Sequence, residues 1–384
     1  MKKIALLMCL VMLSGCSWMR FWEDESDIDL LEPAELVDFE PSVKVRKIWS
    51  SGGVGEINTG TSNIKPAHGN GAIYAADSDG RVVAVDEHSG KVVWKKDLDD
   101  QLTGGVGFGA NQVLVGSVEG QLYVLSAENG AILWVTDTSS EILAAPASNG
   151  KQVVVQTQDG KLKAFDADSG APSWQFEIDV PVLTIRGTSS PMITHNMVFA
   201  AFANGKVYAF RADNGLLMWE ARVAIPAGRT ELERIVDIDG DMLLEEDILY
   251  AVSFQGRLGA FARGTGRSLW FQDVSSHRKP GFGLGQIYIT DEDDIVRAYR
   301  SSSGQPLWSN DQMRLRLLTS PVTVAGYVAV ADDDGYLHVL SQSDGSFVGR
   351  KKIDGSGVSA DMIASDDKLF VLDNDGSLRA FSFN

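Results

Sequence analysis

Side chains that could carry out chemistry are sparse in this sequence and do not converge on one site. The five histidines are His68, His88, His195, His277 and His338. They fall at unrelated positions, and no two stand at the spacing of a metal-binding pair. Neither the G-x-S-x-G elbow of a serine hydrolase nor a phosphate-binding P-loop occurs. The sequence therefore predicts no catalytic residues.

Two kinds of glycine-rich stretch match ligand-binding loops only in part. "GVGFGA" (105–110) matches a dinucleotide fingerprint, but that motif needs a following helix, and its flanks here are typical of strands. "DDDG" (332–335) and "DNDG" (373–376) suggest calcium loops, yet both lack the terminal glutamate of an EF-hand. Aspartate and glycine are favoured in turns for conformational reasons. We therefore predict neither a cofactor nor a bound metal.

The N-terminus predicts a different chemistry, at Cys16. A short positive stretch, "MKK", precedes an apolar core (4–13) that is too short to span a bilayer and is typical of a signal peptide. The core ends in "LSGC" (13–16), which resembles the lipobox of bacterial lipoproteins. The resemblance implies removal of residues 1–15 and acylation of Cys16, and Ser17 resembles the outer-membrane sorting pattern of Gram-negative bacteria. An ordinary secretory signal with a chance cysteine is the alternative.

Residues 16–42 are predicted to be the acylated cysteine followed by a tether. The stretch 23–43 is acidic, poor in aromatic residues and interrupted by two prolines, so we expect it to be mostly unstructured. An acidic docking peptide is the alternative interpretation. The whole chain has a formal net charge of -18, which argues against a nucleic acid or a membrane surface as its binding partner.

From residue 43 to 384 the chain repeats itself about every forty residues. "DGRVVAVDEHSGKVVW" (79–94) has relatives that begin at residues 119, 159, 204, 255, 293, 334 and 375. Each copy has a turn, a strand that is apolar on both faces and, where the chain is long enough, a second glycine ten residues after the turn position. The second glycine predicts a hairpin turn with positive φ. A tryptophan that recurs at one position predicts packing between adjacent units.

Four short strands fit into each copy, which predicts an all-β fold: an eight-bladed β-propeller with four-stranded antiparallel blades. The eighth copy stops before its tryptophan strand, while "VKVRKIW" (43–49) supplies such a strand at the other end of the domain. We therefore expect the N-terminal strand to complete the last blade and close the ring. An open β-solenoid is the alternative.

Two connections that flank the fourth copy are longer than the others. The turn positions 160, 205 and 256 are 45 and 51 residues apart, against 40 for the two preceding intervals. The added residues that draw attention are Leu183, Ile185, Arg186, Arg229, Glu231, Glu233, Arg234, Asp237 and Asp239. Extra length on one face of a repeat array is typical of a binding face, and an apolar centre with a charged rim is typical of a protein interface. Alternatively, Arg186 pairs with Asp237 or Asp239 inside the protein and Leu183 belongs to the core.

The repeats resemble those of pyrroloquinoline-quinone dehydrogenases, but the whole pattern is more similar to the BamB family, the propeller lipoproteins of the outer-membrane β-barrel assembly machinery. The similarity rests on the lipobox, the eight copies and three stretches: "LTIRGTSSP" (183–191), "TELERIVDID" (230–239) and "LLTSPV" (317–322).

This resemblance implies a non-enzymatic scaffold that is lipid-anchored to the outer membrane, faces the periplasm and assists the folding and insertion of β-barrel proteins. It implies binding to the periplasmic domains of BamA through Leu183, Ile185, Arg186, Asp237 and Asp239. Direct uptake of an unfolded client strand at a blade edge is a second expected activity that stays open. The alternative from another class is a periplasmic quinoprotein oxidoreductase, which the lack of a vicinal cysteine pair and of an acidic calcium cluster disfavours.

Overall fold

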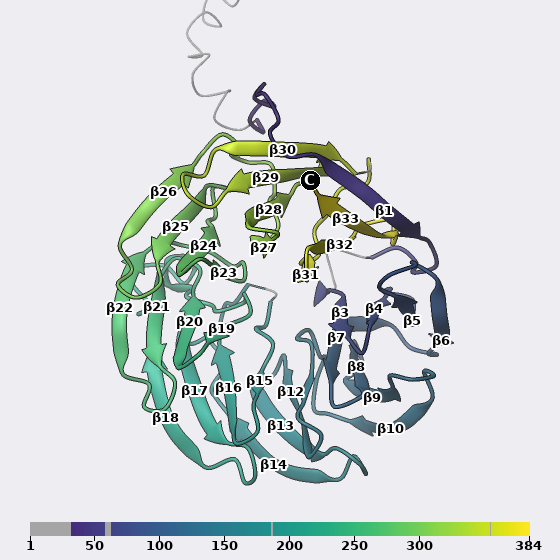
Figure 1. Ribbon diagram of the computed structural model, residues 1–384. Coiled ribbons are helices and arrows are strands. Elements are labelled where there is room, and N and C mark those ends of the chain that lie inside the picture. Colours follow the sequence, from purple (N-terminus) through teal and green to yellow (C-terminus); the bar gives the residue numbers. More distant parts are fainter. Residues whose placement is uncertain (1–31, 58–62, 186, 354) are drawn as a thin grey trace, which may run out of the picture.

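The computed structural model describes residues 32–57, 63–185, 187–353 and 355–384. Within them the chain forms eight sheets arranged around one axis, as Figure 1 shows. From the inner to the outer edge, blades one to four are β3 (Ala67–Gly69), β4 (Ala72–Ala76), β5 (Arg81–Asp86), β6 (Val92–Asp97); β7 (Leu102–Gly109), β8 (Gln112–Ser117), β9 (Gln121–Ser126), β10 (Ile132–Asp137); β11 (Ala147–Ser148), β12 (Gln152–Thr157), β13 (Lys161–Asp166), β14 (Pro172–Glu177); and β15 (Met192–Ile193), β16 (Met197–Phe202), β17 (Lys206–Arg211), β18 (Leu217–Arg222).

Blades five to eight follow the same order. They are β19 (Leu243–Glu245), β20 (Ile248–Val252), β21 (Arg257–Ala262), β22 (Ser268–Asp273); β23 (Gly281–Gly283), β24 (Gln286–Thr290), β25 (Val296–Arg300), β26 (Pro306–Asn310); β27 (Val322–Val324), β28 (Tyr327–Ala331), β29 (Tyr336–Ser341), β30 (Phe347–Lys352); and β31 (Ile363–Ser365), β32 (Lys368–Leu372), β33 (Leu378–Phe383), β1 (Val45–Ser51). The predicted eight-bladed propeller is confirmed.

The ring is closed by the N-terminal strand, as predicted. Strand β1 pairs antiparallel with β33, from Val45 opposite Phe383 to Ser51 opposite Leu378. One feature departs from the expected pattern. A two-residue strand, β2 (Asn63–Ile64), adds a parallel fifth strand to the inner edge of blade two by pairing with β7.

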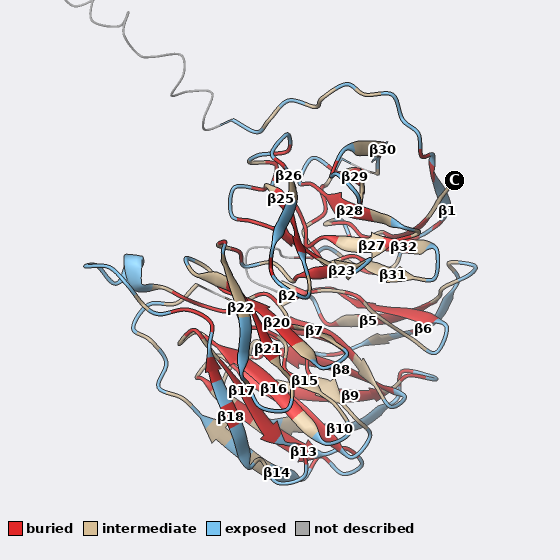
Figure 2. Cartoon of the chain, turned by 60° about the vertical axis from the view of Figure 1, so that its left-hand side comes forward, coloured by how far each residue is buried: buried red, intermediate tan, exposed pale blue. Residues whose placement is uncertain are grey.

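The hydrophobic core lies between neighbouring blades. The third strand of each blade is buried on both faces, as its apolar pattern predicted; β9 and β17, for example, are buried along their whole central stretch. One core cluster joins Leu122 and Val124 of blade two to Val153 and Phe165 of blade three. Figure 2 shows the middle strands in red and outer strands such as β18 and β22 largely in pale blue. Each blade therefore depends on its neighbours to bury its apolar faces.

The recurring tryptophan and the second glycine form the contact between blades. The ring of Trp134, on the outer strand of blade two, lies against Gly170 in blade three, and its indole N–H donates to the carbonyl of Ala167 over 2.9 Å. A Cβ atom on Gly170 would lie 2.7 Å from that ring, and the residue has a φ of +71°. The same tryptophan-to-glycine contact occurs at Trp49–Gly90, Trp94–Gly130, Trp174–Gly215, Trp219–Gly266, Trp270–Gly304 and Trp308–Gly345. The predicted packing between units is confirmed.

The N-terminal segment differs from its prediction at its described end. Residues 34–42, which we assigned to the tether, are bonded to the propeller at both ends: the amide of Ala34 donates to the carbonyl of Arg314, in the connection before blade seven, and that of Ser42 donates to the carbonyl of Val348 in β30. The unstructured character predicted for the tether thus does not extend to these residues. Cys16 lies outside the described residues. Among the residues that are described, no helix is long and apolar enough to cross a membrane.

Candidate partner-binding surface

The two long connections open on the same face of the ring. Residues 178–191 lead from β14 to β15, and residues 223–242 lead from β18 to β19. Each therefore runs from the outer strand of one blade to the inner strand of the next, and such connections share one face of a propeller. The second connection contains the only helical turn among the described residues, the 3-10 helix η1 (Leu232–Arg234), none of whose residues is buried.

Asp237 holds the first connection to the second. Its carboxylate oxygen Oδ2 accepts the backbone N–H of Ile185 over 2.5 Å, and the residue is only 1% exposed. Burial raises the pKa of Asp237 to about 6, although the hydrogen bond from Ile185 acts in the opposite direction. This carboxyl group therefore positions a loop and is not itself a surface contact.

Asp239 lies where the two connections approach most closely. A Cβ atom on Gly187 would lie 2.6 Å from Asp239 Cγ, so only glycine fits at that position beside the carboxyl group. Burial, together with the negative charge of Asp237, raises the pKa of Asp239 to about 8. The oxygen Oδ2 of Asp239 is buried without a hydrogen-bond partner among the described residues. A neutral, protonated carboxyl group is the form that this environment favours at neutral pH.

Exposed apolar side chains accompany both connections. Leu183 is 42% exposed and its neighbour Val182 is 86% exposed, so the alternative that Leu183 belongs to the core is wrong. On the second connection, Ile225 and Leu232 are 65% and 67% exposed. Leu183 was predicted from the sequence, whereas the other three were not. The run "PVL" (181–183) held a signal for Val182, since an apolar pair in a connection has no strand to bury it.

Asp241 anchors the same connections to the centre of the ring. It forms an ion pair with Lys65, beside β2, and its oxygen Oδ1 accepts the amide of Ser190 over 2.9 Å. Burial opposes ionisation of Asp241, but the charges of Lys65 and Lys279 outweigh it and hold the pKa of Asp241 below its ordinary value. Lys65, Asp241 and Lys279 line a pocket of about 380 Å³ together with Ile185 and Asp239. Asp241 could not be predicted, because nothing in the sequence links it to Lys65.

The structure thus brings together most of the predicted site. Ile185, Asp237 and Asp239 converge at the junction of the two connections, and Leu183 lies beside them on an exposed stretch. Arg186 lies outside the described residues.

The aspartate-rich turns behave as the turn chemistry predicted. Asp332 and Asp373 each accept the backbone amide four residues further on, from Tyr336 and Ser377, over 2.7 Å. "GVGFGA" falls in β7, which is followed by another strand. Among the described residues, no group of three or more histidine, cysteine, aspartate or glutamate side chains could hold a metal ion.

Eight blades with tryptophan-to-glycine contacts define the class, a β-propeller of pyrroloquinoline-quinone-type repeats. The crystal structure of quinohemoprotein alcohol dehydrogenase from Comamonas testosteroni has this fold, with a TM-score of 0.69 over 88% of this chain and 76% of that one, at 14% identity. At such low identity the likeness concerns the fold alone and gives the oxidoreductase alternative no support.

Comparisons with a family model, with related sequences and with a further crystal structure identify the family within this class. The family described as "Outer membrane protein assembly factor BamB" matches residues 78–310 and 292–384. Proteins of that name from Pseudomonas aeruginosa and Escherichia coli K12 are 48% and 32% identical, over 99% and 97% of this chain and 98% and 96% of their own length. The crystal structure of BamB from Moraxella catarrhalis superposes with a TM-score of 0.80 at 28% identity, covering 88% of this chain and all of that one. The chain belongs to the BamB family.

Proposed function

We propose that this protein is a non-enzymatic scaffold of outer-membrane protein assembly, and that it binds the periplasmic domains of BamA through the connections that flank blade four. Its relatives carry the name of an outer-membrane protein assembly factor. In this proposal the protein helps β-barrel proteins to fold and insert by holding BamA, and it faces the periplasm. Cys16, acylated after removal of residues 1–15, anchors it to the outer membrane.

The observation that carries the proposal is the junction between Ile185 and Asp237. A buried carboxyl group fixes the backbone of one connection to the other, so the exposed residues Val182 and Leu183 project from a supported loop. A supported apolar loop loses little conformational entropy on binding, which favours affinity. Leu183 is the direct contact in this proposal, whereas Asp237 and Asp239 act by shaping the surface around Ile185. Arg186, which lies outside the described residues, is assigned to BamA binding by the family resemblance alone.

Leu183→Asp tests the assignment, because it places a charge at the centre of the proposed interface without disturbing the core. The matched control is Leu284→Asp. Leu284 is also exposed but lies in the turn between β23 and β24, on the opposite face. Loss of a central apolar contact of about 2 kcal/mol weakens binding roughly 30-fold. We expect Leu183→Asp to lose co-purification with BamA from membranes and Leu284→Asp to retain it, with thermal unfolding midpoints unchanged in both.

Co-purification of both variants with BamA at the wild-type level would show that the surface around Leu183 does not bind BamA. Loss in both variants would instead locate the contact elsewhere on the ring or indicate a general effect of the added charge.

A further inference from the structure

Residues 34–43, here called the strap, cross the outer edge of blade seven before the chain enters β1. The strap begins where the amide of Ala34 donates to the carbonyl of Arg314 over 2.9 Å. It ends where the amides of Ser42 and Val43 both donate to the carbonyl of Val348, over 3.0 and 2.9 Å. Figure 1 shows this purple segment beside β30, and Figure 2 shows it arching over β30 toward β1. The strap is thus bonded to the propeller at both ends.

Two arginine side chains hold the first part of the strap. Nη1 of Arg316 donates to the carbonyl of Ala34 over 2.9 Å, and Nη1 of Arg350 donates to the carbonyl of Val37 over 2.8 Å. The ring of Phe39 stacks on Phe347, with 5.4 Å between the ring centroids. The guanidinium carbon of Arg350 lies 5.0 Å from the centroid of each ring, within cation–π range. The contacts suit an extended segment that offers carbonyls three residues apart and an aromatic side chain.

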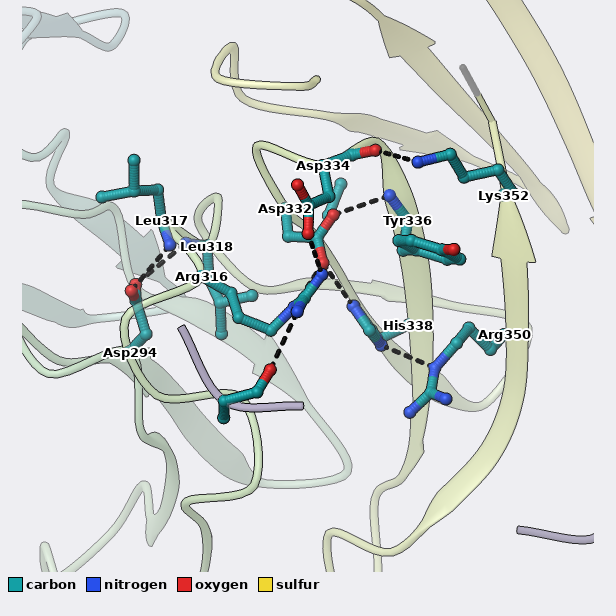
Figure 3. Close-up of polar contacts among 12 residues, drawn as sticks. Asp294, Arg316, Leu317, Leu318, Asp332, Asp334, Tyr336, His338, Arg350 and Lys352 are labelled. Carbon is teal, nitrogen blue, oxygen red and sulfur yellow. Dashed lines mark hydrogen bonds and ion pairs between the residues drawn. The ribbon is translucent and has the colours of Figure 1, made fainter. Parts of the chain in front are cut away.

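A buried polar network behind the strap fixes both arginines (Figure 3). Nε of Arg316 and Nε2 of His338 lie 2.7 and 2.9 Å from the same oxygen of Asp332, a residue with no exposed surface. Nε of Arg350 donates to Nδ1 of His338 over 3.2 Å. Since Nδ1 accepts a hydrogen bond, His338 is neutral with its proton on Nε2. Hydrogen bonds to buried groups of blade seven therefore orient both guanidinium groups independently of their bonds to the strap.

This network is a departure from the repeat. In blades six and eight, an arginine on the third strand pairs with the turn aspartate of its own blade. These pairs are Arg297–Asp291 and Arg379–Asp373. In blade seven, His338 stands at the position of that arginine. Because histidine is shorter, the aspartate at this turn, Asp332, also receives Arg316, which enters from the connection between β26 and β27.

A second departure lies beside the strap, where Gly349 stands at the position of the repeat tryptophan. A Cβ atom on Gly349 would lie 3.0 Å from the carbonyl oxygen of Val43. In the other blades the tryptophan packs on a turn glycine of the next blade. Blade eight has no such turn, because the ends of the domain meet there and the amide of Lys44 donates to Asn384 over 2.8 Å. A tryptophan at position 349 would have no turn glycine in blade eight to pack against. The glycine found there leaves room for the strap.

We propose that the outer edge of blade seven is a dedicated docking site for the strap, and that docking fixes the point at which the N-terminal end leaves the propeller. The negative charge of Asp38 on the strap favours the positive charge of Arg350, whereas Arg316 is already paired with Asp332 and Asp334 and holds the strap through the carbonyl of Ala34. Blades seven and three are four positions apart in a ring of eight, so the N-terminal end leaves the ring on the side opposite the connection that contains Leu183.

Docking shortens the free length of chain between Cys16 and the propeller, and so the greatest distance between the lipid anchor and the ring. This consequence rests on the acylation of Cys16 in the proposed function. Ala34 follows Cys16 by 18 residues and Val43 follows it by 27. At no more than about 3.5 Å per residue, the greatest reach is about 60 Å with the strap docked and about 95 Å with it released. Arg314 and Arg316 lie between β26 and β27, in a connection that runs from an outer strand to the inner strand of the next blade, as the two long connections do. The docked end therefore leaves on the same flat face of the ring as Leu183, although at the opposite point of its circumference.

Hydrogen exchange of the strap amides in the purified mature chain tests the docking. In Phe39→Ala, the amide of Ala34 should exchange at least tenfold faster than in the wild type, while amides of β16 stay unchanged. Arg350→Lys keeps the charge but removes the hydrogen bond to Val37, so it should also accelerate exchange. Glu32→Gln, at an exposed position just before the strap, is the matched control and should have no effect.

Strap amides that exchange at the unprotected rate in the wild type would overturn the proposal. Protection that survives both Phe39→Ala and Arg350→Lys would show that the assigned receptor does not hold the strap. The measurement needs neither BamA nor the lipid, so its failure is distinguishable from failure of the proposed function.

Discussion

The contact between Trp134 and Gly170 allows the packing between blades to be measured separately from the backbone conformation of the turn. Gly170 and Gly71 both have a φ of +71°. A Cβ atom on Gly71 would meet nothing within 4 Å, whereas one on Gly170 would lie 2.7 Å from the ring of Trp134. Gly71→Ala therefore introduces the conformational strain alone, and Gly170→Ala introduces the same strain plus a steric conflict with the neighbouring blade.

The two effects have different expected sizes. An alanine in the left-handed region costs about 1–2 kcal/mol relative to the ordinary helical region. Forcing an extra carbon atom into packed surroundings costs about 1–3 kcal/mol more. The effect of alanine on the unfolded chain is similar at both sites and cancels in the comparison. We therefore expect Gly170→Ala to lower the free energy of unfolding by about 1–3 kcal/mol more than Gly71→Ala does.

A double-mutant cycle identifies the ring as the cause. Trp134→Ala removes a buried ring and its hydrogen bond to Ala167, which should destabilise the protein by about 3–5 kcal/mol. In that background Gly170→Ala should cost no more than Gly71→Ala does, because the conflicting ring is gone. Equilibrium urea unfolding followed by circular dichroism measures all four variants, with unchanged m-values as the check on two-state behaviour. Equal effects at Gly71 and Gly170, or strict additivity of the double mutant, would refute the interlocking of blades.

Further predictions concern the junction of the two connections. Asp237→Ala removes the acceptor of the Ile185 amide and should accelerate exchange of that amide about 5- to 150-fold, as loss of about 1–3 kcal/mol implies, whereas Asp237→Asn keeps an acceptor oxygen and should retain most protection. The pKa of Asp239 is raised to about 8 in the folded protein, so the folded state binds more protons than the unfolded state between about pH 4 and 8. The contribution of Asp239 to the free energy of unfolding therefore falls as pH rises through this range, by at most about 1.4 kcal/mol per pH unit. Asp239→Asn should reduce that slope in urea midpoints measured at pH 5 and pH 8; an unchanged slope would contradict the assignment. Gly187→Ala should weaken co-purification with BamA while the propeller still unfolds cooperatively, because its Cβ atom displaces Asp239. Undiminished co-purification would contradict the role given to this junction.

The fold could be predicted because its determinants recur. One tryptophan or one glycine says little, but the pairing of Trp94 with a glycine ten residues after the turn reappears in blade after blade. Closure by residues 43–49 followed from the missing last strand of the eighth copy. Strand β2 could not be predicted, because two residues, Asn63 and Ile64, carry no periodic signal and their partner β7 belongs to another blade.

The candidate site could be located from the sequence but not oriented. Loop length placed Leu183 and Asp237 in neighbouring connections on one face, and the structure joins those connections through Ile185. What the sequence could not say is which side chains point outward, since irregular loops have no period from which to infer a buried face. Asp237, a polar residue in a charged stretch, is almost fully buried, while Val182, an apolar residue of the neighbouring connection, is among the most exposed apolar residues. The docking of the strap could not be predicted either. Its acidic composition indicates an unstructured segment, and the one aromatic side chain that packs on the propeller, Phe39, carries no periodic signal.

Ring closure explains why the residues that depart from the repeat lie in the connections and near the blade where the ends of the domain meet. In a propeller each repeated position already has a task in packing, so a tryptophan or turn glycine cannot change without loosening two blades. The chain is free to vary only in the connections and at the blade where its ends meet. Both of this protein's special surfaces lie there: the junction of Ile185 with Asp237, and the strap on Arg316 and Arg350 beside Gly349. The same reasoning accounts for redox enzymes and assembly factors sharing this fold at 14% identity, since the repeat fixes the ring and leaves its activity to the residues that depart from it.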